Sequence, residues 1–229
     1  MKTVLRKKLD PSKQAVEDVI AAHGATREVS LLGNHFTVLK NVFDPTLAPS
    51  GLMGRHFAAS PAILGKVVAD VGAGTGIFSC LFAMAGAKRV IATDVSRNAV
   101  KNIRSNVVRH KLERKVDIRL GYGLEPLSQF DRIDVIYCDF PFTDWRMPRN
   151  ELDRAFFDVE LKGLKSVLTC FSRTEWMRHV DLFICVSSLS NVWEKLEPHL
   201  GGISRERVVT LEEPWIDLEL WHLRQNLCG

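Results

Sequence analysis

The sequence has few cysteines, and none of them forms a metal-binding or redox pair. Its 229 residues include five cysteines, an odd number without a C-x-x-C spacing. Four of the five lie within apolar segments, where a reduced cysteine behaves as a small hydrophobic residue. Single histidines such as His23 and His56 have no partner at ligand spacing. We therefore expect reduced cysteines and no metal site.

Long apolar runs and long runs of like charge are also missing. No apolar run is long enough to cross a membrane, and the charged N-terminus is not followed by the apolar segment of a signal peptide. The net charge of +4 includes no run of five or six like charges, so the basic residues between Arg104 and Lys115 are expected to form a solvated face. These absences predict a cytoplasmic protein without a membrane partner.

One stretch combines a strand, a glycine-rich turn, a helix and a second strand. The segment Val67 to Val71 is apolar except for Asp70, which predicts a buried strand, and helical composition follows from Thr75 to Ala85. The second strand ends at Asp94. The turn between the first strand and the helix contains Gly72, Gly74 and Gly76. Glycine accepts positive φ values and lets backbone N–H groups approach a ligand, while the helix presents its positive end to the same place. The stretch therefore predicts a nucleotide-cofactor site.

The spacing of the glycines narrows the choice of cofactor. A dinucleotide fingerprint would need its third glycine at Ile77, and no G-x-x-x-x-G-K-[ST] phosphate loop is present. The pattern D-x-G-x-G-x-G resembles motif I of the class I S-adenosylmethionine-dependent methyltransferases. In that family the carboxylate before the turn, together with the turn backbone, holds the methionine end of the cofactor. Asp94 is placed to bind both ribose hydroxyls.

The resemblance implies S-adenosylmethionine as cofactor. Many relatives have an aspartate after the third strand that binds the adenine amino group, whereas this sequence reads Gly121-Tyr122-Gly123. Tyr122 is expected to stack on the adenine or to hydrogen-bond with it. The residues expected to bind the cofactor are Asp70, Gly72, Ala73, Gly74, Gly76, Asp94, Val95 and Tyr122.

The chain alternates predicted strands and helices, which indicates an α/β fold with a Rossmann-like, mostly parallel sheet. The last two strands are joined by only a few residues around Pro214, too few for a crossover, so they must form an antiparallel hairpin. This topology is also that of class I methyltransferases. Further strands are expected at about 116–120, 133–138, 180–187, 203–211 and 216–223, and helices at about 51–59, 96–107, 151–173 and 191–199.

The first fifty residues precede this pattern. An amphipathic helix begins near Pro11 and ends before Gly24, and Gly33-Asn34 suits a tight hairpin between two short strands. We expect residues 1–50 to form this helix and hairpin, as a lid over the substrate, and residues 51–229 to form the methyltransferase domain. The segment Val42-Phe43-Asp44-Pro45 resembles one that packs over the cofactor in glutamine methyltransferases.

In an open α/β sheet the ligand lies beyond the carboxyl ends of the strands, where the fourth strand leads into Asp139-Phe140-Pro141-Phe142. This stretch resembles the Asp/Asn-Pro-Pro-Tyr/Phe motif of methyltransferases that act on planar nitrogen, including those that modify release-factor glutamine. The resemblance makes Asp139 and the Phe140 carbonyl hydrogen-bond acceptors for the substrate N–H groups, with Phe142 stacking on the planar group and Pro141 fixing the turn. Phe140 departs from the motif because it replaces the first proline.

The residues that follow this stretch have two interpretations, because Trp145 and Arg146 either line the substrate pocket or anchor a loop. The expected activity is S-adenosylmethionine-dependent methyl transfer to a nitrogen of a small molecule, a protein side chain or an RNA base. Two alternatives remain open. One is an enzyme of the same fold that uses the cofactor for another reaction, and the other is a non-catalytic cofactor-binding partner subunit.

Overall fold

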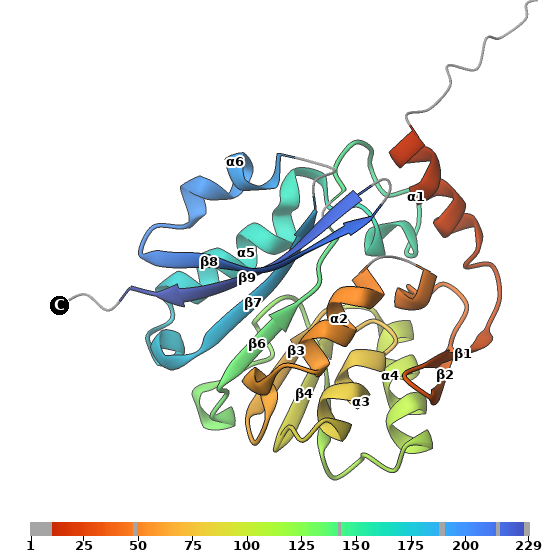
Figure 1. Cartoon of the computed structure of the whole chain (residues 1–229), viewed down its shortest axis with the longest axis horizontal. Helices are drawn as coiled ribbons and strands as arrows, with labels where there is room; N and C mark the ends of the chain where they lie inside the picture. Colours follow the sequence, from red (N-terminus) through yellow and green to blue (C-terminus); the bar gives the residue numbers. More distant parts are fainter. Residues whose placement is uncertain (1–10, 48–49, 142, 188–190, 214–215, 227–229) are drawn as a thin grey trace, which may run out of the picture.

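The computed structural model describes residues 11–47, 50–141, 143–187, 191–213 and 216–226. Its central element is a seven-stranded sheet in the order β5-β4-β3-β6-β7-β9-β8 (Figure 1). The first five strands in this order are parallel, whereas β9 is antiparallel to both β7 and β8. The predicted parallel sheet with a C-terminal antiparallel hairpin is confirmed. The strands are β3 (Val67–Val71), β4 (Arg89–Asp94), β5 (Val116–Leu120), β6 (Val135–Cys138), β7 (Asp181–Ser187), β8 (Ile203–Glu213) and β9 (Ile216–Gln225).

Helices cover both faces of this sheet, so its central strands are apolar on both sides. In β3, Val68 packs into a cluster with Phe82, while the next residue, Ala69, faces the opposite cluster with Phe171. One face carries α2 (Ser50–Ala58), α3 (Ile77–Met84) and α4 (Arg97–Arg109), and the other carries α5 (Lys162–Arg173) and α6 (Val192–Leu196). Short 3-10 helices lie at Pro45–Leu47, Pro61–Ile63, Gln129–Asp131, Asp153–Ala155, Val159–Leu161, Glu175–His179 and Glu197–His199.

The N-terminal segment forms α1 (Pro11–Ala21) and a hairpin of β1 (Arg27–Leu31) and β2 (Asn34–Val38). The hairpin turn lies one residue earlier than predicted. Leu32 and Gly33, with φ values of 51° and 75°, are its central residues, and Asn34 already pairs with Leu31. A two-residue turn of this type needs positive φ at both central positions, so only its second position has the favoured glycine.

Two asparagines on α4 attach the hairpin to the main domain. The amide oxygen of Asn106 accepts from the Thr37 N–H, and that of Asn102 accepts from the Leu39 N–H, each at 2.8 Å. Both side-chain amino groups also donate to the Thr37 carbonyl. These bonds pair the backbone groups along the free edge of β2, which would otherwise need a neighbouring strand. Asn106 donates to the Thr75 carbonyl as well, which links the hairpin to the glycine turn.

The long helix predicted from Glu151 to Arg173 is wrong in its first half, because α5 begins only at Lys162. Upstream, Thr143 pairs with Phe157 and its carbonyl accepts from the Asp158 N–H at 2.9 Å. This pairing holds the backbone extended. Glu160 and Leu161 then take positive φ values of 61° and 56°, which no α-helix accommodates.

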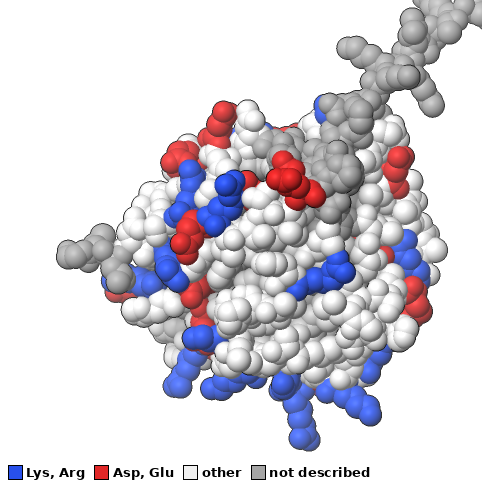
Figure 2. Space-filling model, viewed as in Figure 1, with Lys and Arg blue, Asp and Glu red and all other residues white. Residues whose placement is uncertain are grey.

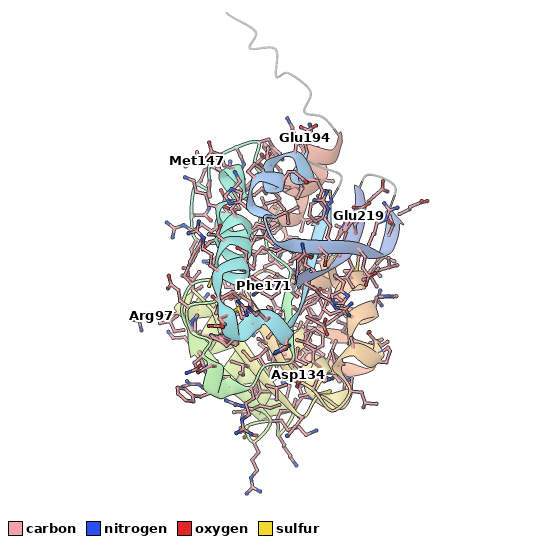
Figure 3. The ribbon with its side chains drawn as sticks, turned by 90° about the vertical axis from the view of Figure 1, so that its left-hand side faces the viewer. Arg97, Asp134, Met147, Phe171, Glu194 and Glu219 are labelled. Atoms are coloured by element: carbon pink, nitrogen blue, oxygen red, sulfur yellow. The ribbon has the colours of Figure 1, made fainter. Side chains whose placement is uncertain are left out.

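The carboxyl ends of the parallel strands lie at one edge of the molecule. Asp134, just before β6, lies in the lower half of Figure 3, and Met147, in the segment after β6, lies near the top. Figure 2 shows Lys and Arg side chains projecting from the lower edge, where the parallel strands begin. Of the basic residues predicted to form a solvated face, Arg104, Lys111 and Arg114 are exposed. No helix among the described residues has the length and apolarity to cross a membrane.

Candidate active site

The turn after β3 has the conformation for which glycine is suited. Gly72, Gly74 and Gly76 have φ values of 78°, 55° and 73°. The N–H groups of Gly72 and Ala73 both donate to the Thr93 carbonyl at 2.9 Å, which fixes the turn against β4. At Gly74 no atom lies within 4 Å of the place that a Cβ would take. The backbone of the turn therefore faces open space at Gly74.

Asp70 lies beneath this turn. Its carboxylate is buried and accepts a hydrogen bond of 2.5 Å from the Ser79 hydroxyl on α3. Burial raises the pKa of Asp70 to about 7, against the effect of this hydrogen bond. In the structure Asp70 ties β3 to α3, and it does not line the cavity that lies above the turn.

Asp94, at the end of β4, reaches the space above the turn. Its Oδ2 atom accepts from the Gly74 N–H at 2.9 Å, and its Oδ1 atom accepts from the Ser96 N–H at 2.8 Å. Burial raises the pKa of Asp94, while these N–H groups oppose the rise. Each carboxylate oxygen has two lone pairs, so both oxygens can accept a further bond from a ligand hydroxyl.

A cavity of about 1080 Å³ opens over the carboxyl ends of β3, β4, β5 and β6. It brings together most of the site residues predicted from the sequence. Asp70, Ala73 and Gly76 do not line it, and Phe142 lies outside the described residues. The predicted residues that line it are Gly72, Gly74, Asp94, Val95, Tyr122, Asp139, Phe140 and Pro141.

Asp139 follows β6 directly and is partly exposed in this cavity. The buried thiol of Cys185 on β7 donates a hydrogen bond to its carboxylate. Burial, and to a smaller degree the nearby Asp70 carboxylate, raises the pKa of Asp139 to about 7. A carboxylate in this setting is a strong hydrogen-bond acceptor, because few groups of the chain compete for its lone pairs.

Phe140, the residue that departs from the sequence motif, fills a gap between two backbone segments. A Cβ at Gly72 would lie 2.8 Å from the Phe140 ring, and a Cβ at Gly163 would lie 3.3 Å from it. Only glycine leaves room for the ring at the first position. The aromatic side chain thus replaces the rigidity of a proline with packing between the glycine turn and α5.

Sequence reasoning missed the residues that form the outer wall of the cavity. Val16 and Val19 of α1 contribute from the N-terminal helix. The segment after β6 also contributes, including Phe156, Phe157, Asp158 and Lys162. The apolar face of α1 and a role as a lid were predicted from the sequence, but the residues of α1 that line the cavity were not. The second group lies where a continuous helix was predicted, so nothing in the pattern marked these side chains.

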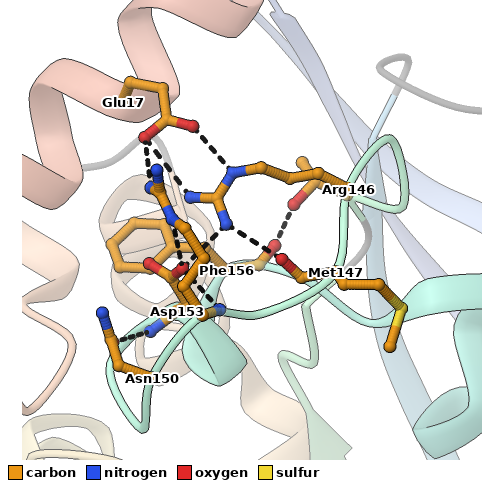
Figure 4. Close-up of polar contacts among 8 residues, drawn as sticks. Glu17, Arg146, Met147, Asn150, Asp153 and Phe156 are labelled. Carbon is orange, nitrogen blue, oxygen red and sulfur yellow. Dashed lines mark hydrogen bonds and ion pairs between the residues drawn. The ribbon is translucent and has the colours of Figure 1, made fainter.

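An ion-pair network joins α1 to the segment after β6 (Figure 4). Glu17 accepts from Arg146 at 2.7 Å and from Arg149 at 2.9 Å. Both arginines also bind the buried carboxylate of Asp153, and Arg146 holds its pKa down to about 2. The Arg146 guanidinium lies 3.7 Å from the centre of the Phe157 ring. Arg146 and Trp145 do not line the cavity, so Arg146 anchors the loop.

Known proteins resemble this chain in sequence and in fold. The family described as "Methyltransferase domain" matches residues 58–138. This match identifies a methyltransferase domain in the chain. A probable protein arginine N-methyltransferase 6.1 from Oryza sativa subsp. indica is 32% identical in an alignment of 228 residues that covers 91% of this chain. This chain spans only 55% of that relative's length.

Solved structures share the fold of this methyltransferase domain at low sequence identity. The B. subtilis M1A22 tRNA methyltransferase TrmK has a TM-score of 0.53 and 16% identity, over 75% of this chain and 64% of that one. SMU.776, complexed with SAH, has a TM-score of 0.59 and 13% identity, over 86% of this chain and 56% of that one. The SAH held by SMU.776 is the product that S-adenosylmethionine leaves after methyl transfer.

The residues of the cavity fit this cofactor. The open space at Gly74 admits a ligand against the turn backbone, and Asp94 offers its lone pairs to ribose hydroxyls beside it. Bound there, S-adenosylmethionine supplies a methyl group activated by a positively charged sulfur. Among the described residues, no group of three or more His, Cys, Asp or Glu side chains is arranged to hold a metal ion.

Proposed function

We propose that this domain methylates a planar nitrogen, an amide or amino group, of a small molecule, a protein side chain or an RNA base. The observation that carries the proposal is the position of Asp139. Its carboxylate lies at the end of β6 and lines the same cavity as Gly74 and Asp94, the residues that fit the cofactor. A hydrogen-bond acceptor therefore lies in the same cavity as the residues that fit the methyl donor.

The chemistry of a planar nitrogen explains why an acceptor is needed. The lone pair of an amide or aromatic amine is delocalised, and positive charge develops on the nitrogen as it is methylated. Fixed acceptors that bind its N–H groups stabilise this charge in the transition state. Asp139 supplies one acceptor and the Phe140 carbonyl a second. Packing of the Phe140 ring against Gly72 and Gly163 keeps that carbonyl in place.

The comparisons support nitrogen as the target but leave the kind of substrate open. The rice relative is named an arginine N-methyltransferase, and the B. subtilis structure is a tRNA methyltransferase. The test is to incubate the protein with labelled cofactor and separate extracts of small molecules, protein and RNA. We expect a labelled product together with S-adenosylhomocysteine. Release of methylthioadenosine would indicate another reaction of the cofactor, and absence of turnover a non-catalytic subunit.

The pH profile of methyl transfer should report the ionisation of Asp139. Because the pKa of its carboxyl is raised to about 7, the acceptor is protonated in weakly acidic solution and ionised in weakly alkaline solution. We expect the rate to rise with pH through about 7 and then to level off. The measurement is the single-turnover rate from about pH 5 to about pH 9. An Asp139→Asn variant should lose this rise, and a rise that persists in the variant would assign the titration to another group.

We propose further that residues 1–50 cover the methyl-acceptor part of the cavity. Val16 and Val19 line it, and Glu17 holds α1 to the segment after β6 through Arg146 and Arg149. Replacing Glu17 with Ala removes the carboxylate of α1 that both arginines bind, whereas their bonds to Asp153 remain, so it should loosen the cover. The acceptor KM should rise several-fold, while the cofactor Kd stays nearly unchanged.

Asp18 provides the matched control for this variant. It lies on the same helix, but its carboxylate accepts a hydrogen bond from the neighbouring Gln14 side chain, at 2.8 Å, and is not part of the network. Asp18→Ala should leave both constants unchanged. Equal weakening of acceptor and cofactor binding in Glu17→Ala would make the segment a support for the whole fold instead of a cover.

A further inference from the structure

The amino ends of three neighbouring parallel strands carry a row of lysines. Lys115, Lys88 and Lys66 directly precede β5, β4 and β3, and all three are exposed. The Lys88 N–H donates to the Lys66 carbonyl, and the Val90 N–H donates to the Lys115 carbonyl, each at 2.8 Å. The three strands therefore begin side by side, with about 4.8 Å from one strand to the next. Figure 2 shows Lys and Arg side chains projecting from this edge.

Few acidic groups neutralise the row. Among the described residues, the Lys88 ammonium group has no ion-pair or hydrogen-bond partner. The Lys115 ammonium group donates to a carbonyl at 3.2 Å, and Lys66 lies 4.0 Å from Asp134, which precedes β6. The row therefore keeps a positive charge, which attracts a polyanion.

Phe130 exposes an aromatic ring at the same edge. It is 84% exposed, more than any other large apolar residue that the structure describes. Phe130 lies in the 3-10 helix Gln129–Asp131, which the Asp131 carboxylate anchors. This carboxylate lies 3.7 Å from Arg89, the first residue of β4, and accepts from Arg119 at 2.6 Å. Because burial stabilises a phenylalanine, a ring held in solvent on an anchored turn is available to a ligand.

A row of cations beside an exposed aromatic ring suits a single-stranded nucleic acid. The ammonium groups contact phosphates, and the ring stacks on a base that no complementary strand covers. Gln129 adjoins Phe130 and is exposed, and its amide has no hydrogen-bond partner among the residues that the structure describes. Such an amide can bind a ribose 2′-hydroxyl, the group that distinguishes RNA from DNA.

We propose that single-stranded RNA binds at the amino ends of the parallel strands, on a surface formed by Lys66, Lys88, Lys115, Gln129 and Phe130. This surface is separate from the cavity, because β4 alone puts roughly 17 Å between Arg89 and Asp94. The inference does not depend on the proposed methyl acceptor.

The test is the fluorescence anisotropy of a labelled single-stranded RNA of about 12 nucleotides, titrated with the full chain at several salt concentrations. Phe130→Ala should weaken binding by about 5- to 100-fold, the effect of losing one stacked base. Lys88→Gln should lower the slope of log affinity against log salt by about 0.7, the effect of one lost phosphate contact. Duplex RNA hides its base faces, so Phe130→Ala should not change the affinity for a duplex of the same length.

Lys101→Gln is the matched control, because it removes an exposed charge from the first half of α4, away from the row. It should leave the affinity and the slope unchanged. Wild-type affinity of Phe130→Ala for the single strand, or a wild-type slope in Lys88→Gln, overturns the proposal. Equal affinity of the wild-type protein for DNA of the same sequence overturns the assignment to RNA. Because neither cofactor nor methyl acceptor is present, failure here is distinct from failure of the proposed methyl transfer.

Discussion

Asp139→Ala is expected to slow methyl transfer by about 100- to 1,000-fold, or roughly 2.7 to 4 kcal/mol, the usual effect of removing one preorganised group that stabilises the transition state. The variant loses the carboxylate that lines the cavity after β6. Cofactor affinity should change little, because Asp94 and the Gly74 backbone remain. The measurement is single-turnover transfer on an identified substrate, beside a cofactor titration of the same variant.

Asp139→Asn is the companion variant. Its amide oxygen still accepts a hydrogen bond, so the loss of rate should be milder than for alanine. Although its rate falls, the folding stability of this variant should rise relative to the wild-type protein. The pKa of Asp139 is about 7 in the fold against a usual value of 3.8, so the folded chain keeps a proton that the unfolded chain has released between these values. Stability therefore falls as pH rises through this window, and it should be recovered by an uncharged asparagine.

A loss of rate together with an unchanged or higher melting temperature would exclude unfolding as the cause. Full activity of Asp139→Ala would remove the planar-nitrogen mechanism and leave the fold and the cofactor in place.

Asp94→Ala is expected to abolish most of the stabilisation that the cofactor provides. For wild-type protein, a ligand at 100 times its Kd stabilises the fold by about 2.7 kcal/mol, which raises Tm by roughly 5 to 10 °C for a chain of this size. The substitution removes both oxygens offered to the ribose and also the acceptor of the Gly74 N–H. The measurement is the shift in Tm on adding S-adenosylhomocysteine.

Asp134→Ala is the control for Asp94→Ala, because it destabilises the fold without removing a ligand contact. The Asp134 carboxylate also accepts a backbone N–H, that of Val67 at 2.8 Å, but at the opposite edge of the sheet (Figure 3). This control should lower the Tm of the free protein and keep the full ligand shift. A full ligand shift in Asp94→Ala would place the ribose elsewhere.

The fold was predictable because its signals are local. Runs of β-branched residues, glycines at fixed offsets and the short connection near Pro214 each restrict the backbone by themselves, and together they specify a parallel sheet with an antiparallel end. The same holds for the cofactor turn. Gly72, Gly74 and Asp94 lie within one strand-turn-helix-strand unit, so sequence spacing fixes their distance in space.

The wall of the cavity could not be predicted, because it depends on contacts between distant segments. Glu17 and Arg146 are 129 residues apart in the sequence, and no sequence spacing reveals the pair. Asp158 lies where apolar residues recur at helical spacing. There the pairing of Thr143 with Phe157 overrides helix propensity, and no glycine or proline marks the break. Tertiary pairing of this kind decides local structure without leaving a sequence signal.

The most direct test of the cofactor site is a calorimetric titration of the wild-type protein with S-adenosylhomocysteine and, separately, with NADH. Both ligands carry an adenosine ribose that a carboxylate at the end of the second strand can bind, but the turn at Gly72 and Gly74 lacks the third glycine of a dinucleotide site. We predict saturable binding of one S-adenosylhomocysteine per chain and no measurable binding of NADH. Binding of NADH without binding of S-adenosylhomocysteine would contradict the assignment of this cavity.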